Sequence, residues 1–326
     1  MKIDWPKLHN SAFAGVPCLV TGGAGFIGSH IVDALVSLGA RVTAIDDLSG
    51  GNRANLNPEA RFIEASILDA AAVNHAVEGA QLVFHQAAKV SVPASVADPV
   101  LYNRVNVDGT VNVLDAARLA GARRFMFAAS SSAYGDSPEL PKIETMPPLA
   151  ASPYAANKIA GEQMLRAYAS TYGIDTVSLR YFNIFGPRQN ANSAYAGVIA
   201  AFARKLLAGE APVITGDGSA TRDFTFVANA VHANLLAARY STRFAGQIIN
   251  IATGQATSVK QLAEAMARLL GCGHLKPQFA PPRPGDVPHS LANLEKAARV
   301  LDYSPIVDFE TGLKTTVEWY RAAARG

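Results

Sequence analysis

A glycine-rich turn between an apolar strand and a helix most strongly constrains the fold of this 326-residue chain. Apolar residues at 16–20 precede the turn, which carries Gly22, Gly25 and Gly28, and apolar residues at helical spacing follow it. A second apolar stretch then leads to an acid, Asp46, about twenty residues beyond the turn. Strand, turn, helix, strand and acid in this order predict a βαβ unit that binds a dinucleotide.

Each part of this unit has a chemical role. Glycine lets the turn bring its backbone close to a pyrophosphate, which rests on the N–H groups at the start of the following helix. The Asp46 carboxylate can accept hydrogen bonds from ribose hydroxyls and would repel a 2′-phosphate. The first basic residue after Asp46 is Arg53, so the sequence predicts NAD rather than NADP. A tight turn with no ligand is the alternative.

Tyr154 and Lys158 lie four residues apart, which places them on one face of a helix. Ser152 is a suitable N-cap for that helix, and Pro153 suits its first turn. A cation within about 4–6 Å lowers the pKa of a phenol, so we expect Lys158 to lower the pKa of Tyr154. A surface helix that carries the two residues by chance is the alternative.

The composition excludes several classes of protein. Hydrophobic residues make up 49% of the chain, enough for a sizeable core, and a net charge of +3 from scattered basic residues predicts no nucleic-acid partner. The pair Arg123-Arg124 is interpreted as a solvated helix end. With no apolar stretch of about 18 residues and no signal segment, we expect no membrane partner and a cytoplasmic protein. Two cysteines and seven scattered histidines predict neither a disulfide framework nor a metal site.

Short apolar strands alternate with helices up to about residue 180. The alternation predicts an α/β fold, a Rossmann-type doubly wound parallel sheet with helices on both faces. We expect residues 1–180 to form the NAD-binding domain, with an N-terminal arm at 1–15. Residues 181–326 are expected to form mainly a smaller C-terminal lobe that binds substrate, with segments that can return to the sheet.

The glycine spacing, the pair Tyr154 and Lys158, and the serine run 130–132 together resemble the extended short-chain dehydrogenase/reductase family. Further stretches make the chain similar to UDP-sugar 4-epimerases, closest to the branch that acts on N-acetylated UDP-hexosamines. These stretches are residues 46–50, 105–110, 129–135, 179–183 and 283–286. The resemblance extends over nearly the whole chain, from about Val16 to Trp319.

The resemblance implies epimerisation at C4 of a UDP-sugar through a 4-keto intermediate, with tightly bound NAD. Tyr154 would be the catalytic acid–base residue, and Lys158 would tune it and hold the nicotinamide ribose. Ser130 would hydrogen-bond the reacting sugar oxygen. Related hexosamine epimerases also use the middle serine, Ser131; alternatively, Ser131 and Ser132 serve only the turn.

The resemblance also assigns residues to the two ligands. The NAD contacts it implies are Gly22, Gly25, Phe26, Ile27, Gly28, Asp46, Asp47, Ser49, Gly50, Ser66, Ile67, Ala87, Ala88, Asn106, Tyr154, Lys158 and Tyr181. The substrate contacts it implies are Ser130, Ser132, Tyr154, Asn183, Tyr195, Val198, Arg222, Arg283, Asp286 and Ser290. The family commonly has an aspartate at the position of Ser66, so we expect a weaker adenine contact there.

Some of these substrate contacts have an evident chemical basis. Arg222 and Arg283 suit the diphosphate because arginine forms charge-assisted bidentate bonds, and Asp286 suits the uridine ribose. Tyr195 is expected to stack near the sugar or uracil, or to pack in its own helix. Ser290 stands where relatives restricted to glucose and galactose have a tyrosine, so it leaves room for an N-acetyl group. Alternatively, it only ends a loop before the next helix.

Other functions compete with C4 epimerisation of an N-acetylated UDP-hexosamine. Related dehydratases need a carboxylate in the serine segment, and there is none between Ala128 and Gly135, so dehydration is not expected. The alternatives are UDP-glucuronate or UDP-glucose 4-epimerisation and, in a different class, a catalytically silent NAD-sensing regulatory protein.

In the resembled family, helices at 99–119 and 153–172 form a four-helix interface, so we expect a homodimer. Packing on the sheet is the competing explanation for their apolar residues.

Overall fold

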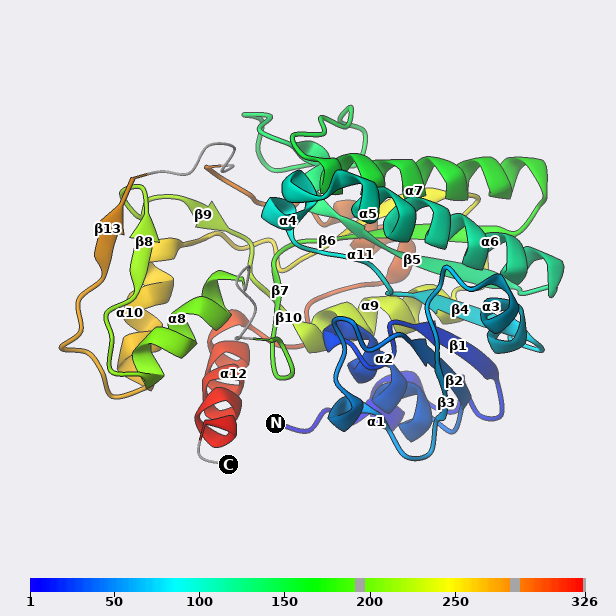
Figure 1. Cartoon of the computed structure of the whole chain (residues 1–326), viewed down its shortest axis with the longest axis horizontal. Coiled ribbons are helices and arrows are strands. Elements are labelled where there is room, and N and C mark those ends of the chain that lie inside the picture. Colours follow the sequence, from blue (N-terminus) through cyan, green and yellow to red (C-terminus); the bar gives the residue numbers. More distant parts are fainter. Residues whose placement is uncertain (191–196, 282–287, 325–326) are drawn as a thin grey trace.

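The computed structural model describes residues 1–190, 197–281 and 288–324, and its centre is one parallel sheet (Figure 1). Its strands are β1 (Pro17–Thr21), β2 (Arg41–Asp46), β3 (Arg61–Glu64), β4 (Leu82–His85), β5 (Arg124–Ser130), β6 (Asp175–Tyr181) and β11 (Gln247–Ile251). They lie in the order β11-β6-β5-β4-β1-β2-β3, and every neighbouring pair is parallel. The α/β, doubly wound fold predicted from the sequence is confirmed.

The two faces of the sheet carry separate hydrophobic clusters because successive side chains of a strand point to opposite faces. Val20 packs in one cluster, with residues of α2 (Phe26–Ser37), α9 (Val227–Arg239) and α11 (Glu295–Leu301). Leu19 packs in the other, with residues of α3 (Ala70–Val77), α6 (Gly109–Leu119) and α7 (Pro153–Thr171). The N-terminal arm contains α1 (Trp5–His9), and Trp5 packs against the first cluster. Helices therefore cover both faces, as Figure 1 shows.

The helix expected at 99–119 is interrupted. The chain forms α4 (Val92–Ala97), α5 (Pro99–Asn103) and then a π-helical turn at Arg104–Asp108 before α6. A π turn accommodates one extra residue within a helix, which the hydrophobic periodicity does not reveal. The turn carries Asn106, which is 2% exposed and is one of the predicted cofactor contacts.

The C-terminal lobe has a third cluster of its own, in which Phe185, Leu262 and Leu313 are buried. Its helices are α8 (Val198–Leu207), α10 (Val259–Leu269) and α12 (Phe309–Ala323). Its short strands are β7 (Ile184–Phe185), β8 (Val213–Thr215), β9 (Thr221–Arg222), β10 (Thr225–Phe226), β12 (Thr257–Ser258) and β13 (Gln278–Ala280). Within the residues that the structure describes, the 3₁₀ turns are η1 (Arg53–Asn55) and η3 (Ser131–Tyr134). Figure 1 shows this lobe beside the carboxyl ends of β5 and β6.

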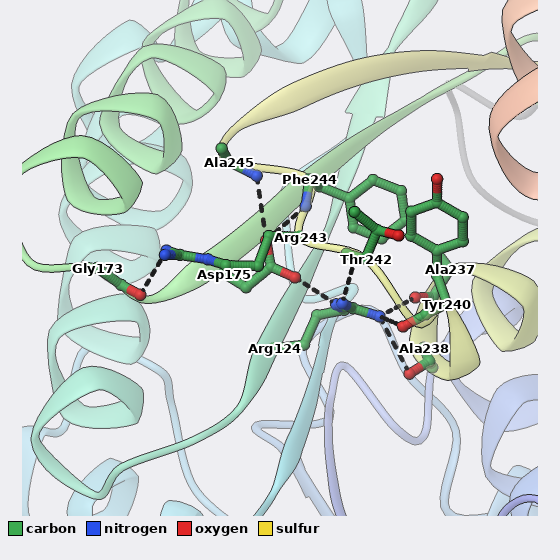
Figure 2. A network of polar contacts seen from close by, with 10 residues as sticks. All are labelled: Arg124, Gly173, Asp175, Ala237, Ala238, Tyr240, Thr242, Arg243, Phe244 and Ala245. Carbon is green, nitrogen blue, oxygen red and sulfur yellow. Dashed lines mark hydrogen bonds and ion pairs between the residues drawn. The ribbon is translucent and has the colours of Figure 1, made fainter.

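Arg124 is not part of a solvated helix end, so that interpretation was wrong. It is 5% exposed and begins β5, and its Nη1 donates to the carbonyl oxygens of Ala237 (2.9 Å) and Tyr240 (2.7 Å) at the end of α9. Its Nε donates to Asp175 Oδ2 at 2.6 Å, and Asp175 Oδ1 accepts from the Phe244 N–H at 2.7 Å (Figure 2). Arg124 therefore satisfies carbonyl groups that a helix end leaves unpaired, and it joins α9 to the sheet.

No helix in the described residues is long and apolar enough to cross a membrane. In the same part of the chain, no group of three or more histidine, cysteine, aspartate or glutamate residues could hold a metal ion.

Replacing Arg124 should strongly destabilise the protein. Arg124→Met leaves the Asp175 carboxylate buried without its charged partner, and we expect the free energy of unfolding to fall by about 3–5 kcal/mol. The matched control is Arg123→Met, since Arg123 is exposed, and it should change stability by no more than about 0.5 kcal/mol. Urea unfolding of both variants measures this; equal stabilities would contradict the role given to Arg124.

Candidate active site

The glycine-rich turn joins β1 to α2 and leaves no space for side chains. Gly22 has a φ of 69°, which L-residues rarely adopt, and a Cβ on Gly28 would lie 2.0 Å from the Gly22 carbonyl oxygen. Gly25 is the N-cap of α2, and no side chain in the described residues caps this helix end. The N–H groups of Phe26 and Ile27 are therefore available to an anion such as a pyrophosphate.

Asp46 ends β2 and is 8% exposed. Its Oδ2 accepts from the Ala24 N–H at 3.0 Å and its Oδ1 accepts from the Leu48 N–H at 2.8 Å. Burial raises the pKa of Asp46, and these N–H groups oppose the shift. The carboxylate thus joins the glycine turn to residues 47–50. Three residues of this segment are exposed and are predicted to contact NAD. Each oxygen retains a lone pair that a ribose hydroxyl can use.

The segment after β4 lies on the other side of β1 from β2. The Ala87 N–H donates to Thr21 Oγ1 at 3.2 Å, and the Lys89 N–H donates to Asn106 Oδ1 at 2.8 Å. Asn106 Nδ2 donates back to the Lys89 carbonyl oxygen at 2.9 Å, so Asn106 holds this segment in place. Lys89 Nζ donates to Ser49 Oγ at 3.0 Å, and this bond joins the segment after β4 to the segment after β2. Sequence reasoning missed Lys89, because a single lysine in a loop carries no signal.

The remaining predicted cofactor contacts lie after β3 and at the end of β6. Ser66 Oγ accepts from the Leu68 N–H at 3.2 Å. Tyr181 donates to Gln86 Oε1 at 3.3 Å and accepts from Asn234 Nδ2 at 2.6 Å, and burial raises the pKa of Tyr181 to about 12. Among all the predicted cofactor contacts, Gly28 and Ile67 are buried, and the half-buried residues are Gly22, Gly25, Phe26, Ile27, Ser66, Ala87, Ala88 and Tyr154.

The predicted catalytic residues are brought together where β5 ends beside α7. Ser130 is the last residue of β5, and its Oγ accepts from the Ser132 N–H at 3.2 Å and from Ser132 Oγ at 2.9 Å. Burial raises the pKa of Tyr154, and a side-chain hydrogen bond with Ser130 opposes this shift. Ser131 has no side-chain hydrogen bond to any residue that the structure describes.

The expectation that Lys158 lowers the pKa of Tyr154 was wrong for this structure. Burial is the largest influence on Tyr154, and it raises the pKa of the phenol. Lys158 Nζ instead donates to the Ala128 carbonyl oxygen at 2.7 Å and lies 4.9 Å from the centre of the Phe127 ring. Lys158 is 4% exposed, and burial lowers its own pKa to about 8. Spacing on a helix shows that two residues share a face, but not where a long side chain ends.

Three of the residues predicted to contact substrate, Asn183, Arg222 and Ser290, lie in or next to β9. Arg222 Nη1 donates to the Thr221 carbonyl oxygen at 2.9 Å and to the Pro288 carbonyl oxygen at 3.1 Å. The Ser290 N–H donates to the same Thr221 oxygen at 3.1 Å, so Arg222 and Ser290 lie on adjoining segments. Asn183 follows β6, and its Nδ2 donates to the Asp223 carbonyl oxygen at 3.4 Å.

Asp223 is a buried organising residue that sequence reasoning did not find. It is fully buried, and its carboxylate accepts from the Thr253 and Gly254 N–H groups at 2.9 and 3.0 Å and from the Ala292 N–H at 3.3 Å. These bonds connect the segment after β11 to the segment that follows Ser290. Val198 is the first residue of α8, whereas Tyr195, Arg283 and Asp286 lie outside the described residues.

A cavity of about 510 Å³ lies elsewhere, between α7 and α11 beside β11. Glu144, Glu162 and Lys296 are among the residues that line it. None of the predicted site residues does, so the catalytic residues do not belong to this cavity.

Comparisons with known proteins agree with this geometry. Residues 18–252 match the model of the NAD dependent epimerase/dehydratase family. The chain belongs to this family. The UDP-glucose 4-epimerase of Mycolicibacterium smegmatis is 42% identical over 310 residues, which cover 93% of this chain and 98% of that protein.

Solved structures of family members are similar over almost their whole length. A UDP-N-acetylglucosamine 4-epimerase from Methanobrevibacter ruminantium, in complex with UDP-N-acetylmuramic acid, has a TM-score of 0.91 and 39% identity and covers 95% of this chain and 100% of that one. A Thermus thermophilus UDP-glucose 4-epimerase in complex with NAD has a TM-score of 0.86 and 37% identity and covers 94% and 100%. The chain described here is therefore an NAD-dependent member of the family. Its glycine turn and Asp46 fit NAD.

We expect Asp46 to control both retention and choice of the cofactor. Denatured wild-type protein should release NAD, and Asp46→Ala should release several-fold less, because the variant loses the acceptor for ribose hydroxyls and the tie between Ala24 and Leu48. Its preference for NAD over NADP should also fall, because the charge that repels a 2′-phosphate is gone. Chromatography of the released nucleotide measures both. Wild-type protein that binds NADP equally well would contradict the assignment.

Proposed function

We propose that this protein interconverts UDP-sugars that differ in configuration at C4, and that UDP-GlcNAc and UDP-GalNAc are its preferred pair. The observation that carries the proposal is the contact of the Ser130 and Tyr154 hydroxyls, with Lys158 one helical turn from Tyr154. The names of its relatives support C4 epimerisation, since they include a UDP-glucose 4-epimerase and a UDP-N-acetylglucosamine 4-epimerase.

Dehydration is the main competing reaction within the family. A dTDP-glucose 4,6-dehydratase from Streptomyces niveus is 34% identical over 319 residues. That chemistry needs an acid–base pair that removes the C5 proton and expels the C6 hydroxyl. The segment from Ser130 to Tyr134 holds only serine, alanine and tyrosine, and the hydroxyls of Ser130 and Ser132 bond to each other. The site therefore supports epimerisation better than dehydration.

The proposed roles follow from where each group lies. Tyr154 accepts the O4 proton while C4 is oxidised and donates it when C4 is reduced, and Ser130 hydrogen-bonds the same oxygen. NAD, when bound, supplies the oxidation at C4 and the later reduction. Lys158 places a buried cation beside this part of the site, held by the Ala128 carbonyl oxygen.

Inversion at C4 requires the 4-keto sugar to present its other face. The UDP end must then stay fixed while the sugar turns. We assign Arg222 and Arg283 to the diphosphate and Asp286 to the uridine ribose; Arg283 and Asp286 lie outside the described residues. Arg222 is oriented by the Pro288 carbonyl oxygen, next to the segment that carries Ser290. With these assignments, Ser290, the residue proposed to select the sugar, would lie one segment away from the proposed diphosphate site.

A homodimer completes the proposal. Exposed apolar residues on the neighbouring helices α4, α5 and α6 include Val96 at 65%, Val100 at 70% and Leu119 at 68%. Met164 on α7 and Tyr172, directly after it, are exposed as well. A second copy of these helices would cover this apolar surface as a four-helix bundle. Analytical ultracentrifugation should give twice the chain mass of 34.3 kDa, and a monomer at micromolar concentration would contradict it.

Tyr154→Phe tests the proposed chemistry. The variant keeps the ring and loses only the hydroxyl, so we expect kcat to fall at least a thousandfold while UDP affinity stays within about twofold of wild type. Turnover of UDP-GlcNAc and titration with UDP measure the two quantities. A variant that keeps most of its rate would place the acid–base group on another residue.

Ser290→Tyr tests the proposed choice of sugar. A tyrosine would fill the space an N-acetyl group needs, so kcat/KM for UDP-GlcNAc and UDP-GalNAc should fall at least tenfold, about 1.4 kcal/mol. The values for UDP-glucose and UDP-galactose should change little. Ser290→Ala is the control, because it leaves the space open and should keep the preference. Equal losses for both pairs of sugars would show that Ser290 does not select between them.

A further inference from the structure

A buried polar network connects α7, the helix that carries Tyr154 and Lys158, to residues 289–293, which we call the sugar-side segment because they include Ser290. It consists of Glu162, Arg180, Tyr134 and Asn250, all of which are at most 1% exposed. These residues come from α7, β6, η3 and β11, so no two of them are close in the sequence. Because buried polar groups need partners, each member restricts where the others can lie.

The network begins on the helix that carries the catalytic residues. Glu162 lies one turn beyond Lys158 on α7, and its two carboxylate oxygens accept from Arg180 Nε and Nη2, both at 2.7 Å. The bidentate geometry restricts both side chains. The Arg180 guanidinium lies 4.6 Å from the centre of the Tyr134 ring, so the pair also contacts the turn after Ser130.

The side chain of Tyr134 links the turn η3 to β11. It ends the turn η3, which begins directly after Ser130, and its hydroxyl donates to Asn250 Oδ1 at 2.7 Å. Asn250 Nδ2 then donates to the carbonyl oxygens of Lys142 at 2.9 Å and Asn293 at 3.4 Å. The amide of Asn250 is therefore bonded through both its oxygen and its nitrogen.

The last step reaches the sugar-side segment, residues 289–293. The Lys142 N–H donates to the Leu291 carbonyl oxygen at 2.7 Å, and the Asn293 N–H donates to the Lys142 carbonyl oxygen at 2.9 Å. Asn250 thus fixes both strands of this small bridge, and Ser290 lies directly before Leu291. The network connects the two sides of the proposed site without using a residue assigned to substrate or cofactor.

We propose that Tyr134 is a positioning residue for epimerisation: its hydroxyl fixes the sugar-side segment relative to Ser130 and Tyr154. The inference rests on the proposed function. A reacting sugar must meet the acid–base group within fractions of an ångström, and small misplacements cost large factors in rate. Loss of the Tyr134 hydroxyl leaves Asn250 Oδ1 without its partner and frees the bridge at Lys142 to shift.

Tyr134→Phe tests the proposal because it removes only the hydroxyl and keeps the ring beneath Arg180. We expect kcat for UDP-GlcNAc to fall at least fivefold and the preference for acetylated over plain UDP-sugars to narrow at least threefold. UDP affinity and NAD content should stay within twofold of wild type, since neither ligand is assigned to Tyr134. Asn250→Ser withdraws the amide from Lys142 and Asn293, and it should narrow the same preference.

The matched control is Thr176→Val. It also deletes a buried hydroxyl, whose bond to the Leu165 carbonyl oxygen at 2.9 Å joins β6 to α7 at the opposite end of the sheet. This control should lower thermal stability and leave kcat, KM and sugar preference unchanged. If Tyr134→Phe and Asn250→Ser behave like Thr176→Val, Tyr134 is only structural and the inference is overturned, while the proposed function stands. Wild-type protein inactive on every UDP-sugar would overturn both.

Discussion

The parallel pairing of the central sheet places chemically distinct side chains at one edge. Because all seven strands run in the same direction, their carboxyl ends meet, and the last residues of β1, β2, β4, β5 and β6 are Thr21, Asp46, His85, Ser130 and Tyr181. The register aligns Thr21 with His85 and Ser130 with Tyr181. The expected binding surface for NAD and the serine proposed as catalytic are therefore consequences of one backbone arrangement.

Polar groups buried behind this edge keep the loops in place. Thr21 Oγ1 bonds to His85 Nδ1 at 2.8 Å, and burial lowers the pKa of His85 to about 3, so the imidazole is neutral. Asp223 and Asn250 hold the loops of the C-terminal half in the same way. Because an unpaired buried group costs about 1–3 kcal/mol, each of these bonds favours one loop conformation. In the proposed reaction, rigid loops would hold UDP while the sugar turns.

Local patterns in the sequence were sufficient to predict the fold, and they are also the basis of the residues proposed for the centre of the site. The glycine turn, Asp46, Ser130 and the pair Tyr154 and Lys158 each belong to one short segment, so spacing reveals them. Features formed by distant segments were missed or misjudged. Arg124 was interpreted as solvated because its partners at Asp175 and 237–242 are more than fifty residues away. The same separation hid the bond between Tyr134 and Asn250.

The most direct measurement follows the hydrogen at C4 of the sugar. UDP-GlcNAc carrying deuterium at C4 is incubated with purified protein in ordinary water without added cofactor, and the products are analysed by mass spectrometry and NMR. The account predicts UDP-GalNAc that retains the deuterium at C4, because the bound cofactor returns the same hydrogen. Loss of the label to solvent, or turnover only with stoichiometric added NAD, would contradict it.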